Sequence, residues 1–190
     1  MTSLFKNKLL AVGLVALVQT MALVWMIADR VSLLKSGREI VLPVVPVDPR
    51  DLFRGDYVTL SYDISRLRLD GEAGRKRTSK TSVYAVVKKT PDGSWKADRL
   101  VLARPAQLAS DEQLIQGRFD SRWGGGFLGA WSMPHYGIEK YFVPEGTGPQ
   151  LEKAAREKKL AAVIAVDKNG RAALKGLVID GKVRYEEPLF

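Results

Sequence analysis

Two glutamates in an aromatic stretch are the residues of this chain whose spacing best suits acid–base chemistry. Glu139 and Glu145 lie in "YGIEKYFVPEGTGPQLE" (136–152). Two carboxylates at a suitable separation can act as general acid and general base. A spacing of six residues across a strand end does not fix that separation. The simpler interpretation is that these glutamates form a salt bridge with Lys140 or Arg118, or provide a charge at a helix start.

A third carboxylate, Asp56, lies in the stretch "GDYVTLSY". The preceding segment "DPRDLFRG" (48–55) predicts a single helical turn that ends at Gly55, where a left-handed conformation is favourable. Asp56 would then hydrogen-bond backbone amides across a bend that leads into a strand. Two alternatives stay open: recognition of a partner by Asp56 together with Arg50 and Arg54, and catalysis.

Aromatic residues flank both stretches and are expected to be core or half-buried. These are Tyr57, Tyr62, Tyr136 and Tyr141. Alternation places Val58, Leu60, Tyr62 and Ile64 on one strand face, which is a credible core face.

The composition argues against several cofactor classes. The chain has no cysteine and one histidine, His135, which lacks a partner at metal-ligand spacing. Thr147-Gly-Pro would expose amides at a helix start, but no lysine follows as in a phosphate loop. We expect no cofactor and no bound metal.

The amino-terminal segment predicts a membrane anchor. Residues 9–28 contain no charged side chain, and twenty helical residues span roughly 30 Å. A cleaved signal peptide and a buried soluble helix are the alternatives; the missing small-x-small site argues against the first. The predicted organisation is a cytoplasmic tail (1–8), the anchor, a linker (29–38) and a soluble domain (39–190).

Charge suggests the surroundings of that domain. The net charge is +9, which favours an anionic membrane surface or nucleic acid as neighbour. Basic residues on both sides of the anchor leave orientation open by counting, but the tail resembles the n-region of an export signal. We therefore expect the tail inside and the domain outside, near the lipid bilayer and away from nucleic acid.

The rest of the chain predicts an α+β fold, mostly antiparallel β with one substantial helix. The segment 39–48 suits an edge strand or a strand entered late, because it contains Pro43 and Pro46. A hairpin is expected around "PDGS", further strands in "EQLIQGRFD" and "YGIEKYFVP", a helix from Pro149, and three closing strands joined by two turns. The stretches 66–80 and 122–135 read as loops.

The two motifs together resemble the bacterial GDYXXLXY family, membrane-anchored proteins of uncharacterised function. The residues that carry the resemblance, or surround it, are Arg50, Arg54, Gly55, Asp56, Tyr57, Leu60, Tyr62, Tyr136, Gly137, Glu139, Tyr141, Glu145 and Gly146. The resemblance implies a membrane-anchored envelope protein, often associated with polytopic membrane proteins. Together with the expected orientation, this predicts a protein of the bacterial inner membrane whose domain faces the periplasm. It supplies no catalytic residue.

Two functional hypotheses follow. The first is a non-enzymatic binding or accessory module for an integral membrane protein; the second is a small carboxylate-based hydrolase or ligand-binding domain. A loose likeness to membrane-anchored signal peptidases is rejected, because Pro46, Val47 and Asp48 occupy the places where the nucleophilic serine would be expected. The sequence does not indicate whether the protein is a monomer or an oligomer.

Overall fold

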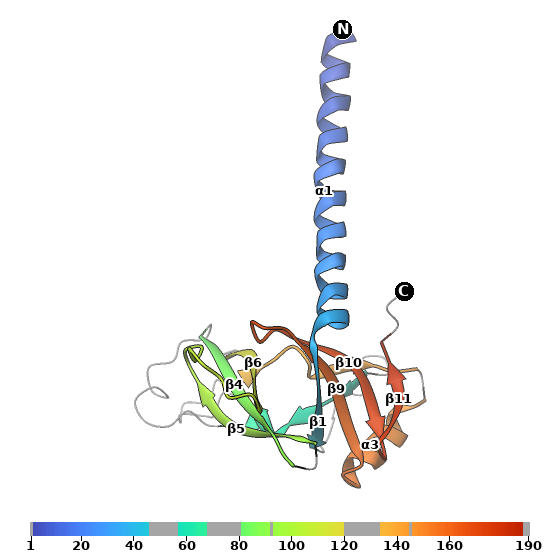
Figure 1. Cartoon of the computed structure of the whole chain (residues 1–190). Helices are drawn as coiled ribbons and strands as arrows, with labels where there is room; N and C mark the ends of the chain where they lie inside the picture. Colours follow the sequence, from blue (N-terminus) through green and yellow to red (C-terminus); the bar gives the residue numbers. More distant parts are fainter. Residues whose placement is uncertain are drawn as a thin grey trace, which may run out of the picture.

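A computed structural model describes residues 2–45, 57–67, 81–91, 93–119, 134–144 and 146–187. It shows a long helix standing on a β-rich domain (Figure 1). The elements are α1 (Thr2–Ser36), β1 (Arg38–Val45), β2 (Tyr57–Thr59), β3 (Ser61–Tyr62), the 3-10 helix η1 (Asp63–Arg66), β4 (Ser82–Lys89), β5 (Trp95–Val101), β6 (Glu112–Phe119), β7 (Pro134–His135), β8 (Lys140–Phe142), α3 (Gly148–Arg156), β9 (Leu160–Val166), β10 (Ala172–Ile179) and β11 (Lys182–Glu186). Within the described ranges, all strand pairs are antiparallel and two α-helices occur, which confirms the α+β prediction.

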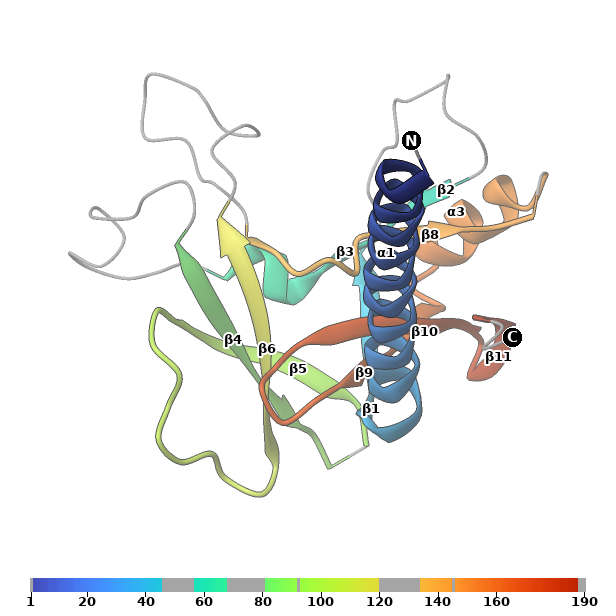
Figure 2. The same ribbon diagram turned by 90° about the horizontal axis from the view of Figure 1, so that it is seen from above.

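Helix α1 is long and apolar enough to cross a membrane over Leu10–Ser36. It projects away from the domain in Figure 1 and is foreshortened in Figure 2. Residues 29–36 of the expected linker are helical, because Leu33 and Leu34 pack against Ala173 of β10. The helix ends at Gly37, whose amide donates to the Leu33 carbonyl at 3.0 Å.

Beneath the helix lies a five-stranded sheet in the order β11-β10-β9-β1-β3. The three closing strands and the two connecting turns are confirmed. Of the two alternatives for 39–48, the edge strand is wrong for the described part, because β1 pairs with β9 over Arg38–Pro43 and with β3 at Val44 and Val45.

A four-stranded sheet, β5-β4-β6-β7, packs beside the first one. The predicted hairpin is β4–β5, whose turn is closed by hydrogen bonds between Thr90 and Ser94. Trp95 of β5 is buried against β1, and the Arg38 guanidinium lies 4.8 Å from the centre of its ring. Side chains from both sheets share one hydrophobic core.

The predicted core face of the motif strand is confirmed. Val58, Leu60, Tyr62 and Ile64 are all at most 9 % exposed. The strand itself breaks at Leu60, because β2 pairs with β8 whereas β3 pairs with β1.

The segment "YGIEKYFVP" is not one strand as expected. Its first four residues form a turn between β7 and β8, which Gly137 enters with φ +78°. The predicted helix after Pro149 is confirmed as α3, with Thr147 at its N-cap. Leu151, Ala154 and Ala155 of α3 are buried in the core.

Candidate functional site

The two sequence motifs meet in the structure. Val58 of β2 lies opposite Tyr141 of β8, and Thr59 lies opposite Lys140. Beyond the end of this ladder, the Leu60 amide donates to the Glu139 carbonyl at 2.7 Å. The pairing explains why both stretches are apolar and aromatic, although nothing local in either one indicates that they are partners.

Two tyrosines tie these segments together reciprocally. The Tyr62 hydroxyl donates to the Ile138 carbonyl at 2.8 Å, and the Tyr136 hydroxyl donates to the Ile64 carbonyl at 3.0 Å. Both side chains are at most 5 % exposed. Burial, reinforced by the negative charge of Glu139, raises the pKa of both hydroxyls above the usual value. Both tyrosines therefore remain protonated donors at neutral pH.

Glu139 closes the turn between β7 and β8. Its carboxylate accepts the backbone amides of Tyr136 and Gly137, the second at 2.9 Å. The predicted salt bridge from one of the two glutamates to Lys140 or Arg118 stays a prediction, because Glu145 lies outside the described residues. Both oxygens are engaged by the turn, so Glu139 acts as a structural cap and is poorly suited to proton transfer.

The remaining predicted site residues divide into two groups. Leu60 and Tyr141 are core residues, 1 % and 6 % exposed, and Gly146 takes φ +83° ahead of α3. Tyr57 lies in β2. Outside the described residues lie Arg50, Arg54, Gly55, Asp56 and Glu145. The roles assigned to these five residues stay predictions.

No group of three or more metal-ligating side chains occurs within the described ranges. His135 is a titratable group close to Glu139: its Nδ1 lies 4.0 Å from a carboxylate oxygen of Glu139. The described motif residues therefore build a bend and its core, and the surface offers a better candidate site.

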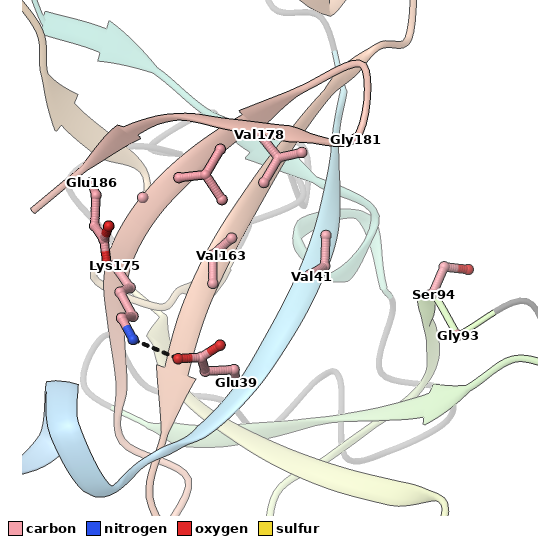
Figure 3. A pocket seen from close by; sticks show the side chains of 11 residues that line it. Glu39, Val41, Gly93, Ser94, Val163, Lys175, Val178, Gly181 and Glu186 are labelled. Atoms are coloured by element: carbon pink, nitrogen blue, oxygen red, sulfur yellow. Dashed lines mark hydrogen bonds and ion pairs between the residues drawn. The ribbon is translucent and has the colours of Figure 1, made fainter.

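That candidate is the outer face of the sheet formed by β1, β9, β10 and β11. Leu33 and Leu34 at the end of α1 cover one part of this face, at Ala173. Next to the covered part lies an open groove of about 530 Å³ (Figure 3). The sequence carried one signal for it: "LAAVIAV" is apolar at every position, as in strands with both faces covered.

The groove is mainly apolar. Four valines line it, one from each strand of this face: Val41, Val163, Val178 and Val183. Val183 is 59 % exposed and Val41 is 39 % exposed. Gly93 and Ser94, from the β4–β5 turn, lie at its far side (Figure 3). An apolar ligand surface would remove these valines from water, at about 25 cal/mol per Å² buried.

An ion pair marks the end of the groove nearest the helix. The Lys175 ammonium lies 2.5 Å from a Glu39 carboxylate oxygen, with Glu186 beside it (Figure 3). The hydrogen bond to Glu39 raises the pKa of Lys175, so the lysine stays charged. This polar rim limits how far an apolar ligand can extend toward the helix.

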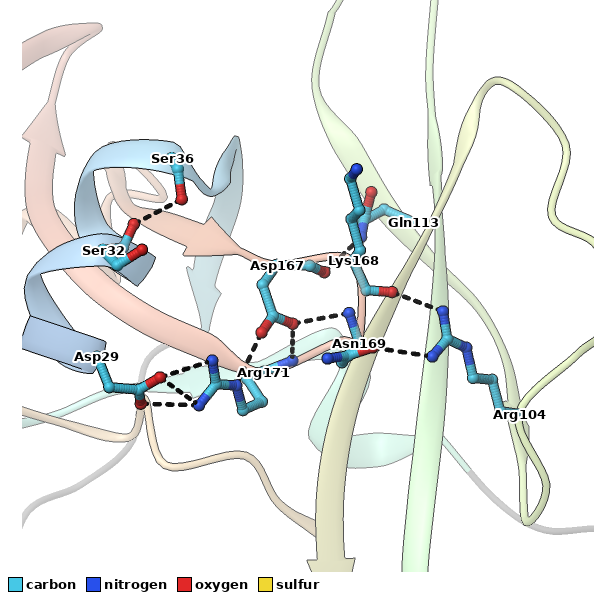
Figure 4. A network of polar contacts seen from close by, with 9 residues as sticks. All are labelled: Asp29, Ser32, Ser36, Arg104, Gln113, Asp167, Lys168, Asn169 and Arg171. Carbon is cyan, nitrogen blue, oxygen red and sulfur yellow. Dashed lines mark hydrogen bonds and ion pairs between the residues drawn. The ribbon is translucent and has the colours of Figure 1, made fainter. Parts of the chain in front are cut away.

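A polar network fixes the helix to the domain (Figure 4). The Arg171 guanidinium donates to both oxygens of Asp29 on α1, the shortest bond being 2.8 Å, and its Nε donates to Asp167 at 2.7 Å. Arg104 reaches the same β9–β10 turn, donating to Asn169 Oδ1 at 3.1 Å. The turn thereby connects the helix with both sheets.

The pKa of Asp167 reflects this position. Burial raises it, but hydrogen bonds from the Arg171 side chain and from the amides of Arg171 and Asn169 outweigh burial and lower the pKa below its usual value. The carboxylate is therefore ionised at neutral pH, as the network requires.

Comparison with known proteins agrees with the motif. A family model described as GDYXXLXY protein matches residues 19–177, a range that includes the second half of α1 and both motifs. No curated protein and no solved structure matches the chain. Because the family match spans far more than half of the sequence, the chain belongs to the GDYXXLXY family.

Proposed function

We propose that this protein is a membrane-anchored accessory module whose outer sheet face binds a segment of an integral membrane protein. The observation that carries the proposal is the apolar groove, which continues the same sheet face that the end of α1 already covers. The occupant is an apolar extramembrane segment that adjoins a transmembrane helix of the partner.

The position of the groove supports this occupant. From Asp29 to Ser36 the helix extends about 12 Å beyond the uncharged span, at 1.5 Å per residue. Val41 follows Gly37 by four residues, which adds about 13 Å of strand. The groove is therefore within roughly 25 Å of the membrane boundary along the chain, which a short loop of a membrane protein can reach.

The junction between α1 and the domain also supports a membrane-bound occupant of the groove. Arg171 binds Asp29 through several hydrogen bonds, and Leu33 and Leu34 pack on Ala173. A domain held in this way presents the groove at a defined height and direction. Such preorganisation reduces the entropy lost when a membrane-bound partner docks.

The proposal includes the side of the membrane on which the soluble domain lies. The short basic tail has the form of an export signal and long following domains translocate readily, which favours a domain on the periplasmic side of a bacterial inner membrane. The family resemblance favours a membrane-anchored envelope protein, which is compatible with this arrangement.

The proposal is tested by co-isolation from native membranes. The full-length protein is compared with Val183→Lys and with Phe142→Lys, a matched control in which an 80 % exposed apolar side chain outside the groove is changed. Both positions are exposed, so each substitution should change stability by less than about 0.5 kcal/mol. We expect an integral membrane protein that copurifies with the wild type and with Phe142→Lys but is lost in Val183→Lys. Equal recovery with all three proteins would contradict the proposal.

A further inference from the structure

The centre of α1 carries one polar amide, Gln19. It follows Lys8 by 11 residues and precedes Asp29 by 10, so it lies near the midpoint of the uncharged span. At 1.5 Å per residue, either charge is about 15 Å away along the helix axis. In a bilayer the side chain of Gln19 would therefore be at the depth where water is scarcest.

Within the part of the chain that the structure describes, the Gln19 side chain has no hydrogen-bond partner. Its neighbour Thr20 is satisfied within the helix, since the Thr20 hydroxyl donates to the Ala16 carbonyl at 2.9 Å. Gln19 is exposed on the helix surface. An amide without a partner in hydrocarbon is costly, and a second helix is the usual source of one.

The helix surface around Gln19 allows close approach. At 100° per residue, Ala16 and Ala22 flank Gln19 at about 60° on either side, and Leu23 lies about 40° from it. Small side chains let two helix backbones pack closely, which brings a neighbouring amide within hydrogen-bond distance.

We propose that α1 pairs with α1 of a second copy of this chain through Gln19. A glutamine amide contains both a donor and an acceptor, so two copies satisfy each other symmetrically. Two copies insert with the same topology, which places both Gln19 residues at the same depth in a parallel pair. A different membrane helix would need its own polar group at that depth.

Single-cysteine crosslinking of the full-length protein in native membranes tests this pairing. The chain has no cysteine, so every disulfide reports the introduced position. Ala16→Cys and Leu23→Cys probe the face that contains Gln19, whereas Val18→Cys and Trp25→Cys probe the opposite face. Catalysed oxidation should give at least severalfold more dimer from the first pair than from the second.

The role of Gln19 is tested in the Ala16→Cys background. Gln19→Leu should lower dimer yield under subsaturating oxidation about threefold to tenfold, as expected for losing two reciprocal interhelical hydrogen bonds. Gln19→Asn, which keeps the amide, should retain most of the yield. Equal crosslinking around the helix, an unchanged yield in Gln19→Leu, or a product joining this chain to a different protein would overturn the proposal.

Discussion

Removing one hydroxyl from the buried tyrosine pair should distinguish a structural motif from a binding motif. Tyr62→Phe keeps the ring but deletes the 2.8 Å hydrogen bond to the Ile138 carbonyl. That carbonyl has no other hydrogen-bond partner in the described part of the chain. Leaving it unpaired should cost about 1–3 kcal/mol. For a domain of this size, the melting temperature should fall by about 2–4 °C per kcal/mol.

Tyr136→Phe is the informative comparison. In this variant the Ile64 carbonyl loses the Tyr136 hydroxyl but still accepts the Leu67 amide, at 3.4 Å. It therefore keeps one partner, and the expected cost is only about 0.5–1.5 kcal/mol. Tyr62→Phe should destabilise the protein more than Tyr136→Phe, although both tyrosines are almost fully buried.

Thermal unfolding of the full-length protein in detergent, followed by near-ultraviolet circular dichroism, measures this order. Tyr84→Phe is the control, because Tyr84 is only partly buried and its hydroxyl makes no hydrogen bond within the described residues. It should change stability by less than about 0.5 kcal/mol. If Tyr62→Phe unfolded like the wild type while losing partner association, the structural interpretation of the motif would be refuted.

Three further predictions concern packing and pH. Gly117→Ala should cost about 1–3 kcal/mol, because the new Cβ would lie 2.8 Å from the Tyr136 ring; a wild-type melting temperature would show that β6 can shift. The free energy of unfolding should fall as pH rises above 10, because tyrosines ionise there in the unfolded chain while the raised pKa values of Tyr62 and Tyr136 keep the folded hydroxyls protonated. In denaturant titrations at alkaline pH, Tyr62→Phe should show a shallower decline than the wild type. Asp167 has a lowered pKa in the folded state, so its contribution to stability is complete above pH 3.8 and is lost as pH falls through the folded pKa. Asp167→Asn should therefore be less stable than the wild type at pH 7, and its free energy of unfolding should fall less steeply in acid. An acid profile parallel to that of the wild type would contradict the network.

Much of the fold could be predicted from alternation and turn chemistry. The three closing strands and the hairpin at Thr90–Ser94 are local features, each marked by apolar alternation and by a turn containing glycine. The break at Leu60 could not be predicted in this way. Leu60 keeps its side chain in the core while the backbone changes partner from β8 to β1, so the alternation continues through the break.

The turn at Tyr136–Glu139 was more accessible to sequence reasoning. Gly137 interrupts an apolar run, and a glycine inside a strand pattern is a signal for a bend. The role of Glu139 depends on that bend, because only the turn brings the Tyr136 and Gly137 amides to its carboxylate.

The junction and the groove depend on contacts between distant segments. Asp29 and Arg171 are 142 positions apart, and no periodicity connects them. The groove combines valines from four strands, of which Val41 and Val183 are the most distant in sequence. Charge and apolar content were visible in the sequence, but the pairing order that brings these residues together was not.

Site-specific photocrosslinking in native membranes tests the binding role of the groove most directly. A photoreactive phenylalanine analogue is placed at Val183 in the groove and, separately, at Phe142 outside it. The account predicts a crosslink from position 183, and not from 142, to an extramembrane segment that adjoins a transmembrane helix of an integral membrane protein. Crosslinks only to a soluble protein, only to another copy of this chain, or to the same protein equally from both positions would contradict it.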